Sequence, residues 1–364
     1  MSFSKENLTS LIQLAVQHKA SDIHIRTNEP PSLRIRGELM EVQSKPLQKA
    51  DIEDIAKMAI NIPEITDKLD ELQEYDGGFA IPNLCRIRFN FFRYSEKAGI
   101  IFRIVNQTIP TLDELKFPKT LAHIAEQKRG LILVTGATGS GKSTTLAAMI
   151  DHINTHRKCH IITIEDPVEY LHTSKKSKIS QREIGKDTKD FNIALRSALR
   201  QDPDVILIGE MRDPETVQIA LKAAETGHVV FSTVHTTNVM ATLGRIISMF
   251  PAEEQEDVRK RLAVNLFSIV SQRMLKRSDT KGVVIAQEIM VTTPGIKECI
   301  MGQEPLARIM DILEEGSGAS GNGSQTFDQH IYYLYKHGRI SKETAMESVA
   351  SEANFLQKLS LEDN

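Results

Sequence analysis

One short segment constrains this chain more than any other feature, because it has the complete pattern of a phosphate-binding loop. The segment reads Gly136-Ala137-Thr138-Gly139-Ser140-Gly141-Lys142-Ser143. Its glycines let the backbone approach phosphate oxygens, its lysine brings positive charge to the outer phosphates, and its last hydroxyl suits Mg²⁺. An apolar run precedes it, and a helix is predicted after it, with the positive N-terminal end facing the anion. We therefore predict a P-loop nucleotide triphosphatase that binds its nucleotide together with Mg²⁺.

Composition and charge exclude several other classes of protein. The chain has 364 residues, of which 40% are hydrophobic and 26% charged, so disorder is excluded and two domains are expected. A net charge of −3 gives no overall attraction to nucleic acid or anionic lipid. Cys85, Cys159 and Cys299 form neither a zinc pattern nor a disulfide framework. Neither a signal peptide nor a long apolar run is found, so we expect a cytoplasmic protein.

The first 106 residues predict a small α+β domain. Apolar residues recur at helical spacing in two segments, and short alternating runs between and after them read as half-buried strands. The predicted helices are residues 7–19 and 51–59, and the predicted strands are residues 23–25, 33–35, 85–94 and 99–105. Residues 107–118, with Pro110, read as a linker.

Residues 119–364 predict a larger α/β domain with a helical C-terminal region. Short apolar runs alternate with helical segments, which is typical of a mostly parallel sheet that is buried on both faces. The predicted strands are residues 131–134, 161–164, 205–208 and 229–231. We expect helices at residues 252–276 and 294–313 and a flexible tether at residues 316–324. A terminal helix follows, with the apolar stripe Phe327, Ile331 and Leu334.

Two carboxylates at predicted strand ends are candidates for catalysis. Glu210 follows the run at residues 204–208 and suits the ordering of Mg²⁺ or of the attacking water. Glu165 ends another strand and suits a general base. Such carboxylates are often only helix caps or polar turns, but the phosphate loop upstream favours the catalytic interpretation.

Three further segments resemble a known family. Residues 163–169, 194–213 and 226–237 resemble the Asp box, the Walker B region and the His box of secretion-type ATPases. The resemblance is specifically to the PilT/PilU-type retraction ATPases of type IV pili, and it extends into the N-terminal domain through Ala20-Ser21-Asp22-Ile23-His24. It implies a RecA-like P-loop ATPase domain preceded by a smaller PAS-like α+β domain. It also implies hydrolysis of ATP to ADP and phosphate.

The resemblance assigns roles to residues that match the family motifs. Glu165 and Glu210 become catalytic carboxylates, His235 a sensor of the γ-phosphate, and His228 a structural link between the site and the sheet. Ser143 and Glu210 would hold the metal. The implied nucleotide-binding residues are Gly136, Ala137, Thr138, Gly139, Ser140, Gly141, Lys142, Ser143 and Thr144. The alternative for either histidine is an ordinary structural role.

Arg88 and Arg103 lie in adjacent predicted strands of the N-terminal domain. Like charges side by side are unfavourable unless something anionic meets them. The surrounding residues resemble the family segment that supplies phosphate-contacting arginines, so the resemblance makes both catalytic. The alternative is a solvated strand face.

The implied function is a hexameric motor that powers type IV pilus retraction and twitching motility. Its expected partners are further copies of itself, the inner-membrane pilus platform protein and a paralogous pilus ATPase, with no nucleic acid. The chain would work in the cytoplasm, peripherally attached to the inner-membrane pilus machine. The match weakens after Thr293-Pro294, where Lys297 and Glu298 replace the family's arginine and asparagine, and residues 325–335 resemble PilU. Main and accessory retraction motor therefore both stay open.

Two other classes of protein are also compatible with the residues alone. One is another secretion- or conjugation-type traffic ATPase, for which a basic groove would favour DNA. Lys175-Lys176-Lys178 is the cluster that offers such charge. The other is a ring adaptor that binds nucleotide without hydrolysing it, against which the intact Lys142, Glu165 and Glu210 argue.

Overall fold

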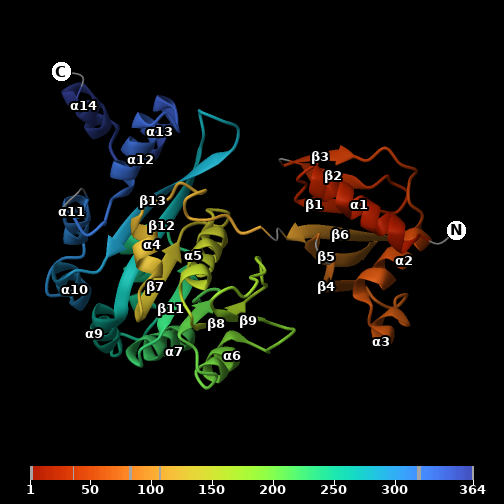
Figure 1. The fold of residues 1–364 in the computed structure, drawn as a ribbon, viewed down its shortest axis with the longest axis horizontal. Coiled ribbons are helices and arrows are strands. Elements are labelled where there is room, and N and C mark those ends of the chain that lie inside the picture. Colours follow the sequence, from red (N-terminus) through yellow and green to blue (C-terminus); the bar gives the residue numbers. More distant parts are fainter. Residues whose placement is uncertain (1–2, 36, 82–83, 106–107, 318–320, 363–364) are drawn as a thin grey trace. The chain divides into compact units, whose positions relative to one another are not determined.

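A computed structural model describes residues 3–35, 37–81, 84–105, 108–317 and 321–362. Contacts between residues divide the chain into two compact units, Met1–Thr108 and Ile109–Asn364 (Figure 1). Each unit has its own sheet and its own hydrophobic core.

The first unit is built on a six-stranded sheet in the order β3-β2-β1-β6-β5-β4, and all its pairings are antiparallel. The strands are β1 (Asp22–Arg26), β2 (Ser32–Ile35), β3 (Glu38–Glu41), β4 (Glu74–Ile81), β5 (Cys85–Tyr94) and β6 (Lys97–Val105). The helices are α1 (Lys5–Gln17), α2 (Lys49–Ile60) and α3 (Pro63–Thr66). Alternate residues of β5 are buried, as expected for a sheet with one face against the core. Ile12 of α1 and Ile52 of α2 are fully buried in that core.

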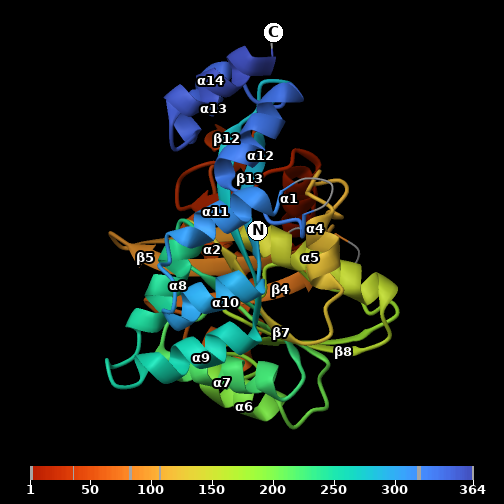
Figure 2. The same ribbon diagram turned by 90° about the vertical axis from the view of Figure 1, so that its left-hand side faces the viewer.

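The second unit contains a seven-stranded sheet in the order β13-β12-β7-β11-β10-β8-β9 (Figures 1 and 2). Its strands run parallel except β13, which is antiparallel to β12. The strands are β7 (Gly130–Thr135), β8 (His160–Glu165), β9 (Lys178–Glu183), β10 (Val205–Ile208), β11 (Val229–Val234), β12 (Leu266–Lys276) and β13 (Val283–Val291). This arrangement confirms the predicted α/β class.

Helices cover both faces of this sheet, so its central strands are apolar on both sides. The first helices are α4 (Thr120–Ala125), α5 (Lys142–His156), α6 (Phe191–Ala198), α7 (Pro214–Glu225), α8 (Val239–Ser248) and α9 (Gln255–Asn265). Leu131 and Leu133 of β7 pack into a core shared with α6 to α9, whereas Ile132 and Val134 pack into one shared with α4 and α5. The continuous apolar runs of the sequence follow from this two-sided burial.

The helix predicted at residues 252–276 is wrong over its second half. Helix α9 ends at Asn265, and the chain continues from Leu266 as β12. This strand lies between β7 and β13, which form backbone hydrogen bonds with both of its edges. The apolar residues of this segment are compatible with either structure, and pairing with distant strands decided the outcome. Strands β3, β4, β9 and β13 were also not predicted.

The C-terminal helices are α10 (Pro294–Met301), α11 (Arg308–Glu315), α12 (Phe327–Lys336), α13 (Lys342–Ser348) and α14 (Glu352–Glu362). The single helix predicted at residues 294–313 is therefore two, because Gly302, at φ 82°, ends α10. Residues 318–320 of the predicted tether lie outside the described residues. Next to them, Ser324 is buried and its Oγ accepts a hydrogen bond of 3.0 Å from Val291 N. Among the helices described, none has the length and apolar character of a membrane span.

Candidate active site

The phosphate loop connects β7 to α5. Gly136, at φ 148°, is required there because a Cβ atom would lie 2.7 Å from the Gln272 carbonyl oxygen and still closer to Ser140 Oγ. Gly141, at φ 92°, precedes Lys142, the first residue of α5. These positive φ values are backbone conformations that favour glycine. The loop therefore has the conformation that its glycines predicted.

Lys142 is only 8% exposed and reaches back across the loop. Its Nζ donates to the carbonyl oxygens of Gly136 at 2.9 Å and Ala137 at 3.0 Å. Burial lowers the pKa of its ammonium group, while the nearby Glu169 and Glu210 act in the opposite direction. The loop thus holds a positive charge in a desolvated place, where an anionic ligand would interact with it strongly.

The predicted catalytic side chains come from neighbouring strand ends. Glu165 is the last residue of β8, Glu210 follows β10 after one glycine, and His235 follows β11 directly. Since these strands run parallel to β7, their carboxyl ends meet at one edge of the sheet. All three side chains line one pocket of about 270 Å³, together with Lys142 and Ser143 of the loop.

Glu210 is the centre of a charged group in this pocket. Its side chain is 11% exposed and forms an ion pair with Arg212, while His235 Nε2 lies 3.4 Å from Glu210 Oε2. The turn below it is fixed by Thr233, whose Oγ1 donates to the Gly209 carbonyl at 2.7 Å. The carboxylate is therefore held between two groups that can carry positive charge.

Glu165 is held by neutral hydrogen-bond donors. Its Oε1 accepts hydrogen bonds from Thr163 Oγ1 at 2.7 Å and from Gln181 Nε2 at 3.3 Å. Burial nevertheless raises the pKa of this carboxyl group, and its hydrogen bonds only partly oppose the shift. A carboxylate with a raised pKa is a better proton acceptor near neutral pH.

The sequence interpretation missed several residues that line the pocket. Tyr170 OH lies 2.9 Å from Thr144 Oγ1 and so contacts the start of α5. Burial lowers the pKa of His172 to about 4, which keeps this histidine neutral. Arg212 and Glu169 also line the pocket. Their nearness in sequence to Glu165 and Glu210 is the signal that could have found them.

The structure does not bring His228 to this pocket. It lies just before β11, at the end of that strand opposite to His235, and six residues of strand correspond to about 20 Å. Its Nδ1 lies 2.9 Å from the Ala223 carbonyl oxygen and 3.1 Å from Thr226 Oγ1. These contacts join β11 to the end of α7.

Arg88 and Arg103 lie in the first unit. They face each other directly across β5 and β6, so their predicted adjacency is observed. The Arg103 side chain is 68% exposed, and its Nε donates to Asp22 Oδ1 at 2.9 Å.

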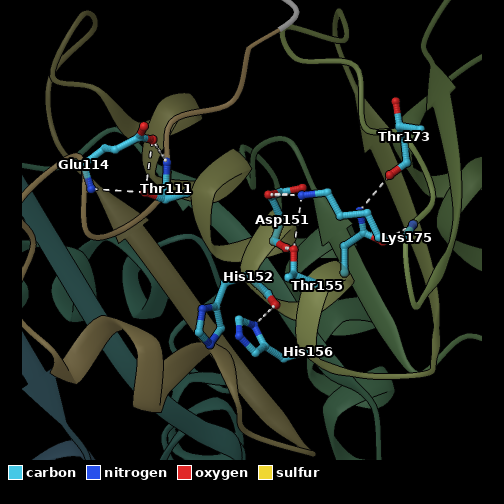
Figure 3. A network of polar contacts seen from close by, with 9 residues as sticks. Thr111, Glu114, Asp151, His152, Thr155, His156, Thr173 and Lys175 are labelled. Atoms are coloured by element: carbon cyan, nitrogen blue, oxygen red, sulfur yellow. Dashed lines mark hydrogen bonds and ion pairs between the residues drawn. The ribbon is translucent and has the colours of Figure 1, made fainter.

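Lys175, one residue of the lysine cluster that offers charge for DNA, is neutralised within the second unit. Lys175 Nζ lies 2.7 Å from Asp151 Oδ2 and donates to Thr155 Oγ1 at 3.2 Å, both on α5 (Figure 3). Thr173, in the same loop, accepts a hydrogen bond from Asn154 at 2.8 Å. The loop is therefore tied to α5, which leaves less charge for a phosphate backbone.

Comparisons with known proteins give similarities over nearly the whole chain. A family model described as "Type II/IV secretion system protein" matches residues 2–359. The type IV pilus retraction ATPase PilT of Pseudomonas aeruginosa is 41% identical over 349 residues, which cover 96% of this chain and 100% of that protein. The type IV pilus ATPase PilU of the same organism is 38% identical over 349 residues, which cover 95% of this chain and 89% of that protein.

A solved structure is similar in fold as well as in sequence. The crystal structure of the pilus retraction motor PilT with bound ADP matches with a TM-score of 0.86 and 40% identity. The match covers 95% of this chain and 97% of that one.

Proposed function

This chain belongs to the type II/IV secretion system protein family, and on that basis we propose that it hydrolyses ATP to drive retraction of type IV pili. The observation that carries the proposal is the pocket in which Lys142, Glu165, Glu210 and His235 meet. The similarity to PilT over the full length supports the choice of retraction among the possible kinds of mechanical work.

The chemistry follows from the charges of this pocket. Lys142 binds the outer phosphates of ATP, which offer it charged partners in place of two carbonyl oxygens. Glu165 accepts a proton from water, whose oxygen then bonds to the γ-phosphorus as the bond to the ADP oxygen breaks. Glu210 orients this water, and His235 donates a hydrogen bond to the phosphoryl oxygens on which charge develops.

The residues also suit a magnesium ion held together with the nucleotide. Among the described residues, no three histidine, cysteine or acidic side chains gather as metal ligands. Mg²⁺ commonly takes few protein ligands besides substrate phosphates, and here Ser143 and Glu210 would serve. When bound, the ion would neutralise phosphate charge.

We extend the proposal to the assembly. The chain forms a homo-hexamer in which the unit Met1–Thr108 of one copy rests on the ATPase unit of the next. The ring acts in the cytoplasm on the inner-membrane pilus platform protein, with a paralogous pilus ATPase as a second partner. Similarity to both PilT and PilU supports either the main or the accessory motor.

Deleting the gene tests the biological role. Cells without the protein should carry more surface pili and lose twitching, because extension continues without retraction. Loss of a main motor should abolish twitching, whereas loss of an accessory motor should only reduce it. Piliation counted by electron microscopy and twitching zones on agar measure both effects. Normal piliation and normal twitching in the deletion strain would contradict the proposal.

Arg88 and Arg103 test whether the first unit takes part in ATP hydrolysis by the second. We propose that they contact the γ-phosphate when the units close on ATP, so that hydrolysis releases the closed state. Arg88→Lys or Arg103→Lys should lower turnover at least about tenfold, or roughly 1.4 kcal/mol, because lysine cannot replace an arginine fork. Steady-state phosphate release measures this change.

Arg26→Lys is the matched control for these two variants. Arg26 is an exposed arginine on β1 of the same sheet, so this change should leave turnover unaltered. All three variants should still form the hexamer by light scattering. Wild-type turnover in both Arg88→Lys and Arg103→Lys would return these arginines to a solvated strand face.

A further inference from the structure

Four hydroxyl groups form a chain behind the candidate active site. Ser271 Oγ on β12 lies 2.8 Å from Thr135 Oγ1, the last residue of β7 before the phosphate loop. Thr135 Oγ1 is 3.5 Å from Thr242 Oγ1 on α8, which in turn lies 2.7 Å from Thr236 Oγ1. Ser271, Thr135 and Thr242 are completely buried. The chain thus connects the sheet below the phosphate loop to the residue that follows His235.

A buried carboxylate on the neighbouring strand also holds this region. Glu288 lies on β13 directly opposite Ser271 and is 2% exposed. Its Oε1 accepts a hydrogen bond of 2.7 Å from the backbone N–H of Val239, the first residue of α8. The first amides of a helix have no partner within the helix, so this carboxylate satisfies one of them and favours the helix N-terminus electrostatically.

The position of His235 depends more on the contacts that hold the start of α8 than on contacts of its own side chain. Its side chain is 47% exposed, and its contact with Glu210, 3.4 Å between Nε2 and Oε2, is long. Residues 236–238 join it to α8, whose first turn is fixed by Glu288, by Thr242 and by Asn238, which accepts a hydrogen bond from Ala241 N at 2.8 Å. A shift of this turn would therefore move His235 relative to Glu210.

We propose that Glu288 and Ser271 are positioning residues that hold His235 and the start of the phosphate loop in register for hydrolysis. They do not line the pocket of the catalytic side chains, and they act through Val239 and Thr135 respectively. The inference rests on the proposed ATPase function and adds two residues on strands that sequence interpretation did not predict. The effect of Glu288 should appear in the catalytic step, because this residue acts through Val239 on the side of His235, whereas nucleotide binding depends on the loop and Lys142.

Two substitutions of Glu288 separate positioning from general packing. Glu288→Gln keeps an oxygen that accepts the Val239 N–H, whereas Glu288→Met keeps the approximate size and removes the acceptor. We expect Glu288→Met to lower kcat about tenfold or more, since small misplacements of catalytic groups are costly. KM and the Kd for a non-hydrolysable ATP analogue should stay within about twofold. Glu288→Gln should restore most of kcat.

A matched pair on β12 gives a second test that does not depend on Glu288. Ser271 and Ser268 are both fully buried serines on this strand, but Ser268 Oγ has no hydrogen-bond partner among the described residues. Ser271→Ala should lower kcat about fivefold through the lost contact with Thr135, whereas Ser268→Ala should leave it unchanged. Thermal unfolding of every variant monitors stability.

The outcomes distinguish this inference from the proposed function. A wild-type protein that does not hydrolyse ATP would contradict the proposed function itself. An active wild type with unchanged kcat in Glu288→Met and Ser271→Ala would overturn the positioning role. Equal losses in Glu288→Met and Glu288→Gln, or in Ser271→Ala and Ser268→Ala, would also overturn it. If Glu288→Met fails to fold, the two serine variants decide the matter.

Discussion

Replacing Lys142 with alanine should abolish ATP hydrolysis and weaken nucleotide binding. The ammonium group is nearly buried at the centre of the phosphate loop, where it contacts two loop carbonyl oxygens. An alanine leaves no positive charge for the outer phosphates, and their charge is then desolvated without compensation. Release of phosphate at saturating ATP and Mg²⁺ measures the first effect, and titration with a fluorescent nucleotide measures the second.

Lys158→Ala is the control for the loss of one lysine from the second unit. Lys158 is exposed just after α5 and lies outside the pocket, so this variant should match the wild type in both measurements. Hydrolysis by Lys142→Ala at a rate near that of the control would mean that the phosphate loop is not the site of catalysis.

Replacing Glu210 with glutamine should leave ATP binding intact and lower turnover about a hundredfold or more, in the range ascribed to general acid–base and related electrostatic effects. Glutamine keeps the shape and the hydrogen-bonding atoms, but it loses the charge that pairs with Arg212 and faces His235. The variant should therefore accumulate bound, unhydrolysed ATP. A filter-binding or fluorescence assay for ATP, run beside phosphate release, detects this separation.

Glu215→Gln provides the comparison for Glu210→Gln. Glu215 also pairs with an arginine, Arg196, but its side chain is half exposed on α7 and lies away from the pocket. We expect full activity in Glu215→Gln, because an exposed ion pair contributes little to stability and this one contacts no reacting group. Turnover by Glu210→Gln close to that of this control would remove Glu210 from the catalytic set.

The sequence was sufficient to predict those elements whose conformation is set by residues close to one another in the chain. The glycines at positions 136, 139 and 141 require particular backbone angles within a few residues of one another, so the loop and the following helix could be predicted. Apolar runs of strand length separated by helical segments likewise indicated the parallel core of the sheet. Glu165 and Glu210 could be selected because carboxyl ends of parallel strands share one edge.

Predictions were wrong where a segment had two locally acceptable structures. Residues 266–276 are apolar enough for a buried helix or a buried strand, and their pairing with β7 and β13 determined that they form β12. His228, which the resemblance gives as a structural link and not as a catalytic residue, lies at the other end of β11 from His235, and of the two only His235 lines the pocket.

The sequence by itself determined the phosphate loop, the α/β class of the second unit and the identity of the strand-end carboxylates. Only the tertiary structure decided which distant groups stand beside them: Gln181 beside Glu165, Glu288 behind His235, and Ser271 against the start of the phosphate loop. The reason is physical. A loop conformation is set by steric limits within a few residues, whereas a contact between strands depends on strand order and register, which arise only when the whole sheet assembles.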